Sequence, residues 1–167
     1  YTEESLAHVA ARVAAVQERL GRQILLENPS AYVAWRGSTM TEWEFLGELA
    51  RRADCGILLD VNNVHVSARN LGFDPVAYLD GIPPERVGQI HLAGHADRGR
   101  YLLDSHDGPV PPPVWDLYRE ALRRLGRVPA LVEWDDRIPP LEDLVAQSRR
   151  AAAIEAVELA PPWRRAS

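Results

Sequence analysis

Apolar residues recur at spacings of three and four along the first twenty positions of the chain. This spacing is typical of one face of an amphipathic helix, and Gly21 follows it as a stop signal. We therefore predict a helix over residues 4–20. Its apolar stripe comprises Leu6, Val9, Ala10, Val13, Val16 and Leu20.

Four later segments carry short continuous apolar runs. Such runs are typical of strands that are buried on both faces of a parallel sheet. We therefore predict four strands. The segments are RQILLEN (22–28), GILLD (56–60), RVGQIHLAG (86–94) and VPALVEW (128–134).

Helices are expected between these strands. Thr41 and Glu44 form a capping-box pattern at the start of one helix. A short helix over residues 74–80 has an aspartate as its cap and a proline at its first position. Further helices are expected over residues 114–126 and 139–157. The polar segments 27–35 and 60–74 are instead expected to form loops after strands.

The alternation of strands and helices predicts an α/β fold with a parallel sheet and crossover helices. A doubly wound nucleotide-binding fold would show a glycine fingerprint after its first strand, and the sequence has none. Polar side chains stand at the strand ends instead, as in a TIM (β/α)8 barrel. About four strand-helix units are present. We therefore expect residues 1–156 to form the C-terminal half of a TIM-barrel metal-binding domain, with the other half upstream, and residues 157–167 to form a tail.

The composition of the chain excludes several classes of protein. The chain has 167 residues, of which 46% are hydrophobic and 26% charged, as expected of one globular domain. Its formal net charge of −5 argues against a nucleic-acid partner. No apolar run is long enough for a membrane span, and residues 1–20 lack the order of a signal peptide, so a cytoplasmic location is expected. The single cysteine, Cys55, excludes an internal disulfide and a cysteine-based zinc site.

Three of the four predicted strands end on a carboxylate, namely Glu27, Asp60 and Glu133. A single acid at such a place is explained by capping of the following helix. A buried carboxylate is nevertheless costly unless a cation or a donor pairs with it. Because the ends of barrel strands converge, three such acids together favour a shared metal site.

Histidines and a further aspartate extend this set. His91 interrupts an apolar strand, where a core histidine bonded to a backbone carbonyl is the alternative. Asp104 and His106 are two positions apart, so in extended backbone their side chains point to the same face. Imidazole and carboxylate together suit iron, manganese or zinc better than calcium or magnesium, and so many ligands exceed one tetrahedral ion. The predicted multinuclear centre consists of Glu27, Asp60, His91, Asp104, His106 and Glu133.

Other polar side chains accompany these candidates along the sequence. The asparagines among them are expected either to hold ligand carboxylates or to satisfy turns, and the remainder to contact substrate or solvent. Two histidines without companions, His8 and His65, are expected to be structural. The accompanying residues are Asn28, Tyr32, Asn62, Asn63, Arg69 and His95.

Five longer motifs are more specific. They are ENPSAY, LLDVNNVHVSARNLGFDPVAYL, QIHLAGH, DSHDGPVPPPVW and LVEWDDRIP. Through them, residues 5–155 closely resemble the multinuclear non-haem iron-dependent oxidases, a bacterial family long catalogued as of unknown function that includes the methanobactin maturase. The resemblance implies a TIM barrel of the xylose-isomerase-like superfamily that binds two or three irons in the complete protein, zinc or manganese being less favoured. It also implies a reaction in which dioxygen is used to modify cysteine residues of a ribosomally made precursor peptide, held by a partner protein.

The resemblance assigns the same six residues as metal ligands, with Glu27 as the bridging glutamate. The pair Asp104 and His106 matches the D-x-H motif of the family. Two further histidine ligands of the family lie in its N-terminal half, which this chain lacks, so the resemblance implies an incomplete site. An incomplete barrel also has open strand edges, which favour self-association.

Two other functions stay open at this point. A zinc-dependent TIM-barrel hydrolase or phosphodiesterase would use the same ligand types to activate water. The acidic balance of the chain argues against a phosphodiester substrate. The second alternative is a truncated, non-catalytic remnant.

Overall fold

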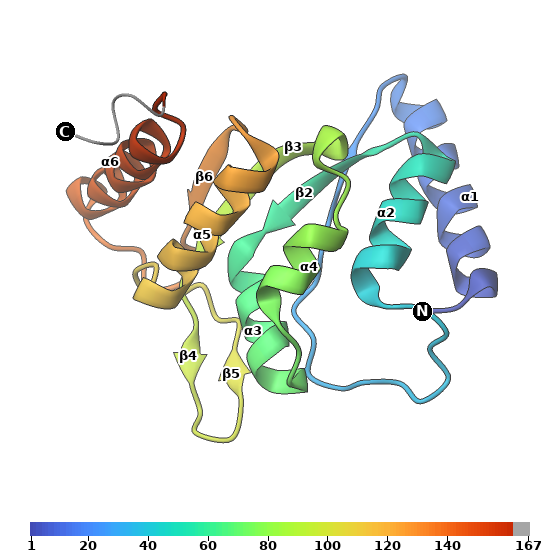
Figure 1. The fold of residues 1–167 in the computed structure, drawn as a ribbon, viewed down its shortest axis with the longest axis horizontal. Helices are drawn as coiled ribbons and strands as arrows, with labels where there is room; N and C mark the ends of the chain where they lie inside the picture. The colour runs from blue at the N-terminus through green and yellow to red at the C-terminus, as the bar shows by residue number, and fades with distance from the viewer. Residues whose placement is uncertain (162–167) are drawn as a thin grey trace.

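Helices and strands alternate along the chain, as the hydrophobic pattern predicts (Figure 1). The computed structural model describes residues 1–161. The helices are α1 (Glu3–Leu20), α2 (Glu42–Ala53), α3 (Val61–Leu71), α4 (Pro75–Gly81), α5 (Pro112–Leu125) and α6 (Leu141–Glu158), with a 3-10 turn, η1, at Pro84–Arg86. The strands are β1 (Leu25–Glu27), β2 (Gly56–Asp60), β3 (Val87–Ala93), β4 (Ala96–Asp97), β5 (Leu102–Leu103) and β6 (Ala130–Glu133).

The four predicted strands form one parallel sheet in the order β1-β2-β3-β6. The predicted α/β class with a parallel sheet is therefore confirmed. The register places Asp60 beside His91 and Ala93 beside Glu133, so the carboxyl ends of the strands share one edge of the sheet. Among the described residues β1 and β6 are the outer strands, and closure into a TIM barrel stays a prediction.

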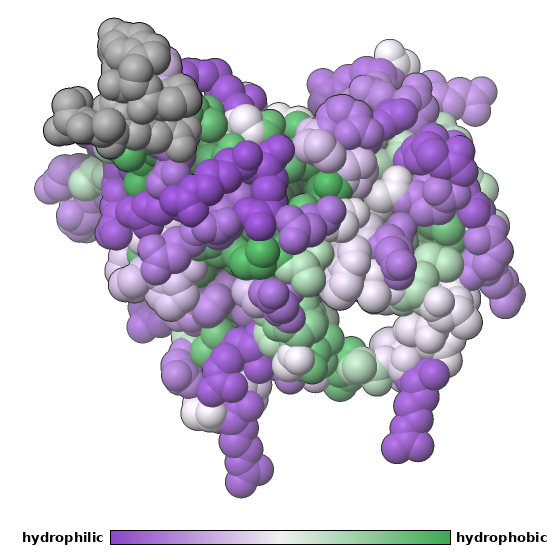
Figure 2. Space-filling model, viewed as in Figure 1, coloured by the Kyte–Doolittle hydropathy of each residue, from purple (hydrophilic) through white to green (hydrophobic). Residues whose placement is uncertain are grey.

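The core lies between the sheet and the helices packed on it. Alternate residues of the central strands, Ile57 and Leu59 in β2 and Ile90 and Leu92 in β3, are fully buried. Helices α3 and α5 contact β3, and Trp115 of α5 is completely enclosed. Figure 2 shows hydrophilic residues over the outward side of α5, so this helix has the two unlike faces that its sequence predicts.

The two outer strands differ from the prediction of burial on both faces. Leu25 of β1 is 40% exposed and Leu131 of β6 is 42% exposed. Each of these strands has only one neighbouring strand among the described residues, so less of its surface is covered. The prediction is wrong for β1 and β6, whereas β2 is buried almost throughout.

Local signals define the helix ends. At the start of α2, Thr41 Oγ1 accepts a hydrogen bond from the Glu44 backbone N–H at 3.3 Å, and the Glu44 carboxylate accepts from the Thr41 N–H at 2.8 Å. The predicted capping box is therefore confirmed. Helix α1 ends at Gly21, whose φ of 65° lies in the left-handed region that favours glycine.

Residues 60–74, expected to be a loop, contain helix α3. Asp60 caps this helix by accepting a hydrogen bond from the Asn63 backbone N–H at 2.7 Å, and Gly72 ends it with a φ of 79°. The loop prediction is wrong because asparagine and histidine side chains interrupt the apolar period along this segment. The buried apolar stripe of α3 includes Val61, Val64 and Ala68.

Two further features fall outside the predicted pattern. Strands β4 and β5 form an antiparallel hairpin that projects from the end of the sheet where the strands finish (Figure 1). Helix α6 continues through Glu158, so the first positions of the predicted 157–167 tail are helical, and residues 162–167 lie outside the described residues.

Across residues 1–161, none of the helices combines the length and the apolar character that crossing a membrane requires.

Candidate metal centre

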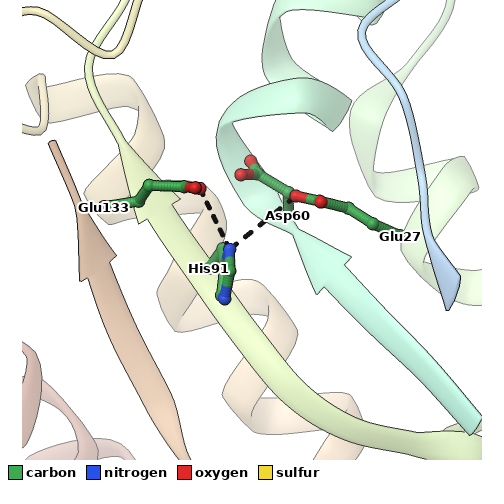
Figure 3. A group of neighbouring side chains, drawn as sticks. All are labelled: Glu27, Asp60, His91 and Glu133. Atoms are coloured by element: carbon green, nitrogen blue, oxygen red, sulfur yellow. Dashed lines mark hydrogen bonds and ion pairs between the residues drawn. The ribbon is translucent and has the colours of Figure 1, made fainter. Parts of the chain in front are cut away.

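Four side chains from the four parallel strands point toward one another at the carboxyl edge of the sheet (Figure 3). His91 Nδ1 lies 3.0 Å from Glu133 Oε2 and 3.7 Å from Glu27 Oε1. With Asp60, each of these residues offers one ligand atom within 4.8 Å of the others. The parallel register explains this convergence, because it brings the ends of separate strands to one level.

Asp60 is fully buried in this group. Its Oδ1 accepts from the Asn63 backbone N–H, whereas its Oδ2 is buried without a hydrogen-bond partner among the described residues. Burial raises the pKa of Asp60 to about 8. A lone buried carboxylate oxygen is costly, and a cation beside it would remove that cost, so the site fits a metal ion. The capping role and the predicted ligand role of Asp60 therefore fall on different oxygens.

Asp104 and His106 lie on the segment that follows the β4–β5 hairpin. His106 Nε2 is 2.6 Å from Asp104 Oδ1, so the predicted pair does come together. His106 Nδ1 is 3.4 Å from Glu133 Oε2 and 3.2 Å from Asp135 Oδ2. Glu133 thus stands between His91 and His106 and belongs to both groups of potential ligands that the described residues form.

Carboxylates lie close together in this group, and they change the pKa values of their neighbours. Burial and the neighbouring Glu133 carboxylate raise the pKa of Glu27. Burial opposes a charge on His106, but the carboxylates around it, first that of Asp104, outweigh this and raise the pKa of His106 to about 9. A cation at this place would reduce the repulsion among these carboxylates.

Two of the predicted supporting asparagines hold Asp60 in place. Asn28 donates to the Asp60 carbonyl at 3.0 Å and accepts from the Asp60 N–H at 2.8 Å. The Asn63 side chain donates to the Asn28 carbonyl at 2.9 Å. Both side chains are buried, so the end of β2 is fixed to the segment that follows β1.

Asn62 supports the other part of the group. Its Nδ2 donates to Asp104 Oδ1 at 2.7 Å, and its Oδ1 lies 2.7 Å from His95 Nδ1. The His95 ring stacks on His65 with 5.1 Å between centroids, and burial lowers the pKa of both imidazoles. The expectation that His65 has no companion is therefore wrong, because α3 places it against the loop after β3.

The remaining candidates lie at the rim or away from the group. Tyr32 Oη accepts from the Asp104 N–H at 3.0 Å, and its ring packs edge-on against Tyr101. Arg69 is exposed on α3, where its charge helps to lower the pKa of His65, rather than among the acids. His8 is exposed on α1.

Sequence reasoning missed Asp135. This residue is two positions after Glu133, and its carboxylate faces His106 from the turn that follows β6. The spacing of two that links Asp104 with His106 also links Glu133 with Asp135, and applying it there would have found the residue.

Comparisons with known proteins match the sequence of this chain to one family. A family model described as "RiPP precursor modification enzyme MbnB/TglH/ChrH" covers residues 1–156. A UPF0276 protein of Anaeromyxobacter sp. (strain Fw109-5) is 67% identical over 160 residues, which are 96% of this chain and 56% of that protein. A UPF0276 protein of Rhizorhabdus wittichii is 57% identical over 145 residues, covering 87% of this chain and 52% of that protein.

A third relative, a UPF0276 protein of Acaryochloris marina, is 51% identical over 151 residues, covering 90% of this chain and 55% of that protein. The chain therefore spans about half the length of the curated relatives it matches.

Proposed function

This chain belongs to the MbnB/TglH/ChrH family of RiPP precursor modification enzymes, and from that premise we propose that it holds part of the iron centre of a multinuclear non-haem oxidase. In this proposal dioxygen is the oxidant. The substrate is a ribosomally made precursor peptide whose cysteine residues are modified.

The buried Asp60 carboxylate gives the strongest support. One of its oxygens has no hydrogen-bond partner among residues 1–161, and it lies with Glu27, His91 and Glu133 in a set of oxygen and nitrogen donors. Such donors suit a divalent transition metal. We assign these four residues to one ion and Asp104 with His106 to a second.

The residues of the chain hold and orient the ligands. Bound iron would supply electrons to dioxygen while the peptide cysteine is oxidised. Asn28 and Asn63 fix the end of β2 through buried hydrogen bonds, and Asn62 fixes Asp104. Tyr32 and Tyr101 stand partly exposed beside the Asp104 backbone, where their rings offer a peptide an apolar surface with hydroxyl groups.

The whole protein is proposed to extend this arrangement. Further strands would close the parallel sheet into a TIM barrel, and two further histidines would complete the ligand set. A peptide-holding partner protein would present the precursor, and the reaction would take place in the cytoplasm. These proposals rest on the family resemblance and on a match that covers about half of each relative.

Metal analysis of matched variants tests the proposal. We would purify the wild type, Asp60→Asn and Asp74→Asn under nitrogen and measure iron, zinc and manganese per chain. Asp74 is the matched control, because it also caps a helix, accepting from the Val76 N–H at 2.9 Å at the start of α4. Asparagine is a good N-cap, so both variants should keep their helix starts.

We expect iron in the wild type and in Asp74→Asn and its loss in Asp60→Asn. Zinc alone in the wild type would favour the hydrolase. If none of the three proteins holds a metal, the chain is better described as a remnant without a metal centre.

A further inference from the structure

The two ring nitrogens of His106 face different carboxylates. Nδ1 points to Asp135 Oδ2 at 3.2 Å, and Nε2 lies 2.6 Å from Asp104 Oδ1. His91, in contrast, presents the same nitrogen to both of its acids. Either nitrogen of His106 could therefore bind a metal ion together with the carboxylate that it faces.

The backbone fixes the ring in this orientation. His106 has a φ of 46°, a left-handed conformation that non-glycine residues seldom adopt. Its N–H donates to the Gly94 carbonyl at 3.1 Å, and its carbonyl accepts from the Asp135 N–H at 2.8 Å. An ion pair between Arg137 and Asp107 joins the same two segments. The turn after β6 thus holds His106 by backbone bonds as well as by the Asp135 side chain.

The carboxylates that the two nitrogens face differ in exposure, because Asp135 is 64% accessible and Asp104 is 14% accessible. An ionised carboxylate only accepts hydrogen bonds, so Nδ1 must donate its proton to Asp135. Nε2 is buried and forms an ion pair with Asp104 Oδ1 at 2.6 Å. A metal ion that takes the place of the proton between these two atoms would have both as ligands.

We propose that Asp135 is a positioning residue that fixes His106 with its proton on Nδ1, so that Nε2 and Asp104 together bind the second metal ion. The inference rests on the proposed metal centre. Histidines that bind metals almost always donate their other ring N–H to a carboxylate, a carbonyl or water, which fixes the tautomer and the ring orientation. The exposed position of Asp135, whose side chain is 64% accessible, suits this supporting role.

The competing arrangement has His106 Nδ1, Glu133 and Asp135 as three ligands of one ion. Zinc serves as a diamagnetic probe that separates the two arrangements by NMR. The protein would carry isotope-labelled histidine, and long-range hydrogen–nitrogen correlations would identify the metal-bound nitrogen. The variants are Asp135→Ala, Asp135→Asn and the control Asp136→Ala. The Asp136 side chain accepts from the Arg137 N–H and makes no hydrogen bond or ion pair with His106 among residues 1–161.

In the wild type and in Asp136→Ala, we expect zinc on Nε2 and a slowly exchanging Nδ1–H signal. Asp135→Ala should lose that signal and bind zinc about 10- to 100-fold more weakly in chelator competition. Asp135→Asn retains an acceptor oxygen and should keep part of the signal. The dispersion of the amide spectrum reports whether each variant is folded.

Zinc on Nδ1 of the wild type would overturn the inference, as would equal signals and affinities in Asp135→Ala and Asp136→Ala. Failure of the proposed function is a distinct result, in which the wild type binds neither iron nor zinc. The Nδ1–H signal of the metal-free protein then still decides whether Asp135 orients His106.

Discussion

Replacing Asp60 by asparagine should stabilise the metal-free chain although it removes a proposed ligand. Burial raises the pKa of Asp60 from its ordinary value of 3.8 to about 8. A carboxyl group whose pKa is raised by folding favours the folded state only in its protonated form. The wild type therefore loses stability as the pH rises from about 4 towards about 8. Asparagine stays neutral across this range and still caps α3.

The pKa shift sets the scale of the effect. Each pKa unit corresponds to about 1.4 kcal/mol. The raised pKa of Asp60 therefore lowers the free energy of unfolding by roughly 5 kcal/mol at about pH 8, but by only about 1.6 kcal/mol at about pH 5. The neighbouring His106 charge lowers the pKa of Asp60 and the Asp104 charge raises it, so the size of the shift depends on both neighbours. We therefore expect the stability gained by Asp60→Asn to be larger at the higher pH by roughly 2–4 kcal/mol.

Urea unfolding in the presence of a chelator measures this gain. The wild type, Asp60→Asn and Asp74→Asn would be compared at about pH 5 and about pH 8, with circular dichroism as the signal. Asp74→Asn should behave as the wild type at both pH values, because that side chain caps an exposed helix start. An equal gain at the two pH values, or an Asp60→Asn variant that is less stable than the wild type at the higher pH, would refute the reasoning.

Three further predictions address ligands, support and assembly. Glu27→Ala should lose iron and His65→Ala should keep most of it by elemental analysis, and equal loss would remove the distinction between ligand and structural histidine. Asn28→Ala should lower the free energy of unfolding by roughly 2–3 kcal/mol in the same urea assay, because it breaks two buried hydrogen bonds to the Asp60 backbone; a loss near zero would contradict this. The 167-residue chain should self-associate in sedimentation through the open edges of β1 and β6, whereas a monodisperse monomer would count against open edges.

Continuous apolar runs were enough to predict the parallel sheet. In a parallel sheet all strands end on the same side, so acids at the ends of three strands had to come close whatever the details of the loops. That reasoning placed Glu27, Asp60 and Glu133 correctly at one edge. The pairing of Asp104 with His106 followed from their spacing, although His106 is in a left-handed rather than an extended conformation.

Other features depended on three-dimensional contacts that spacing does not encode. Helix α3 was missed because the asparagines beside the candidate metal centre break its apolar period. The stacking of His65 on His95 depends on how that helix packs against the loop after β3, and the role of Asp135 depends on the turn after β6. In each case the deviation from a simple pattern lies next to the candidate metal centre, and such deviations are expected at functional sites.

Anomalous diffraction at the iron absorption edge tests the central claim most directly. Crystals of the chain grown with ferrous iron under nitrogen should show an anomalous peak among Glu27, Asp60, His91 and Glu133. An iron peak elsewhere on the molecule, with none at this edge of the sheet, would contradict the assignment of these residues as a metal centre.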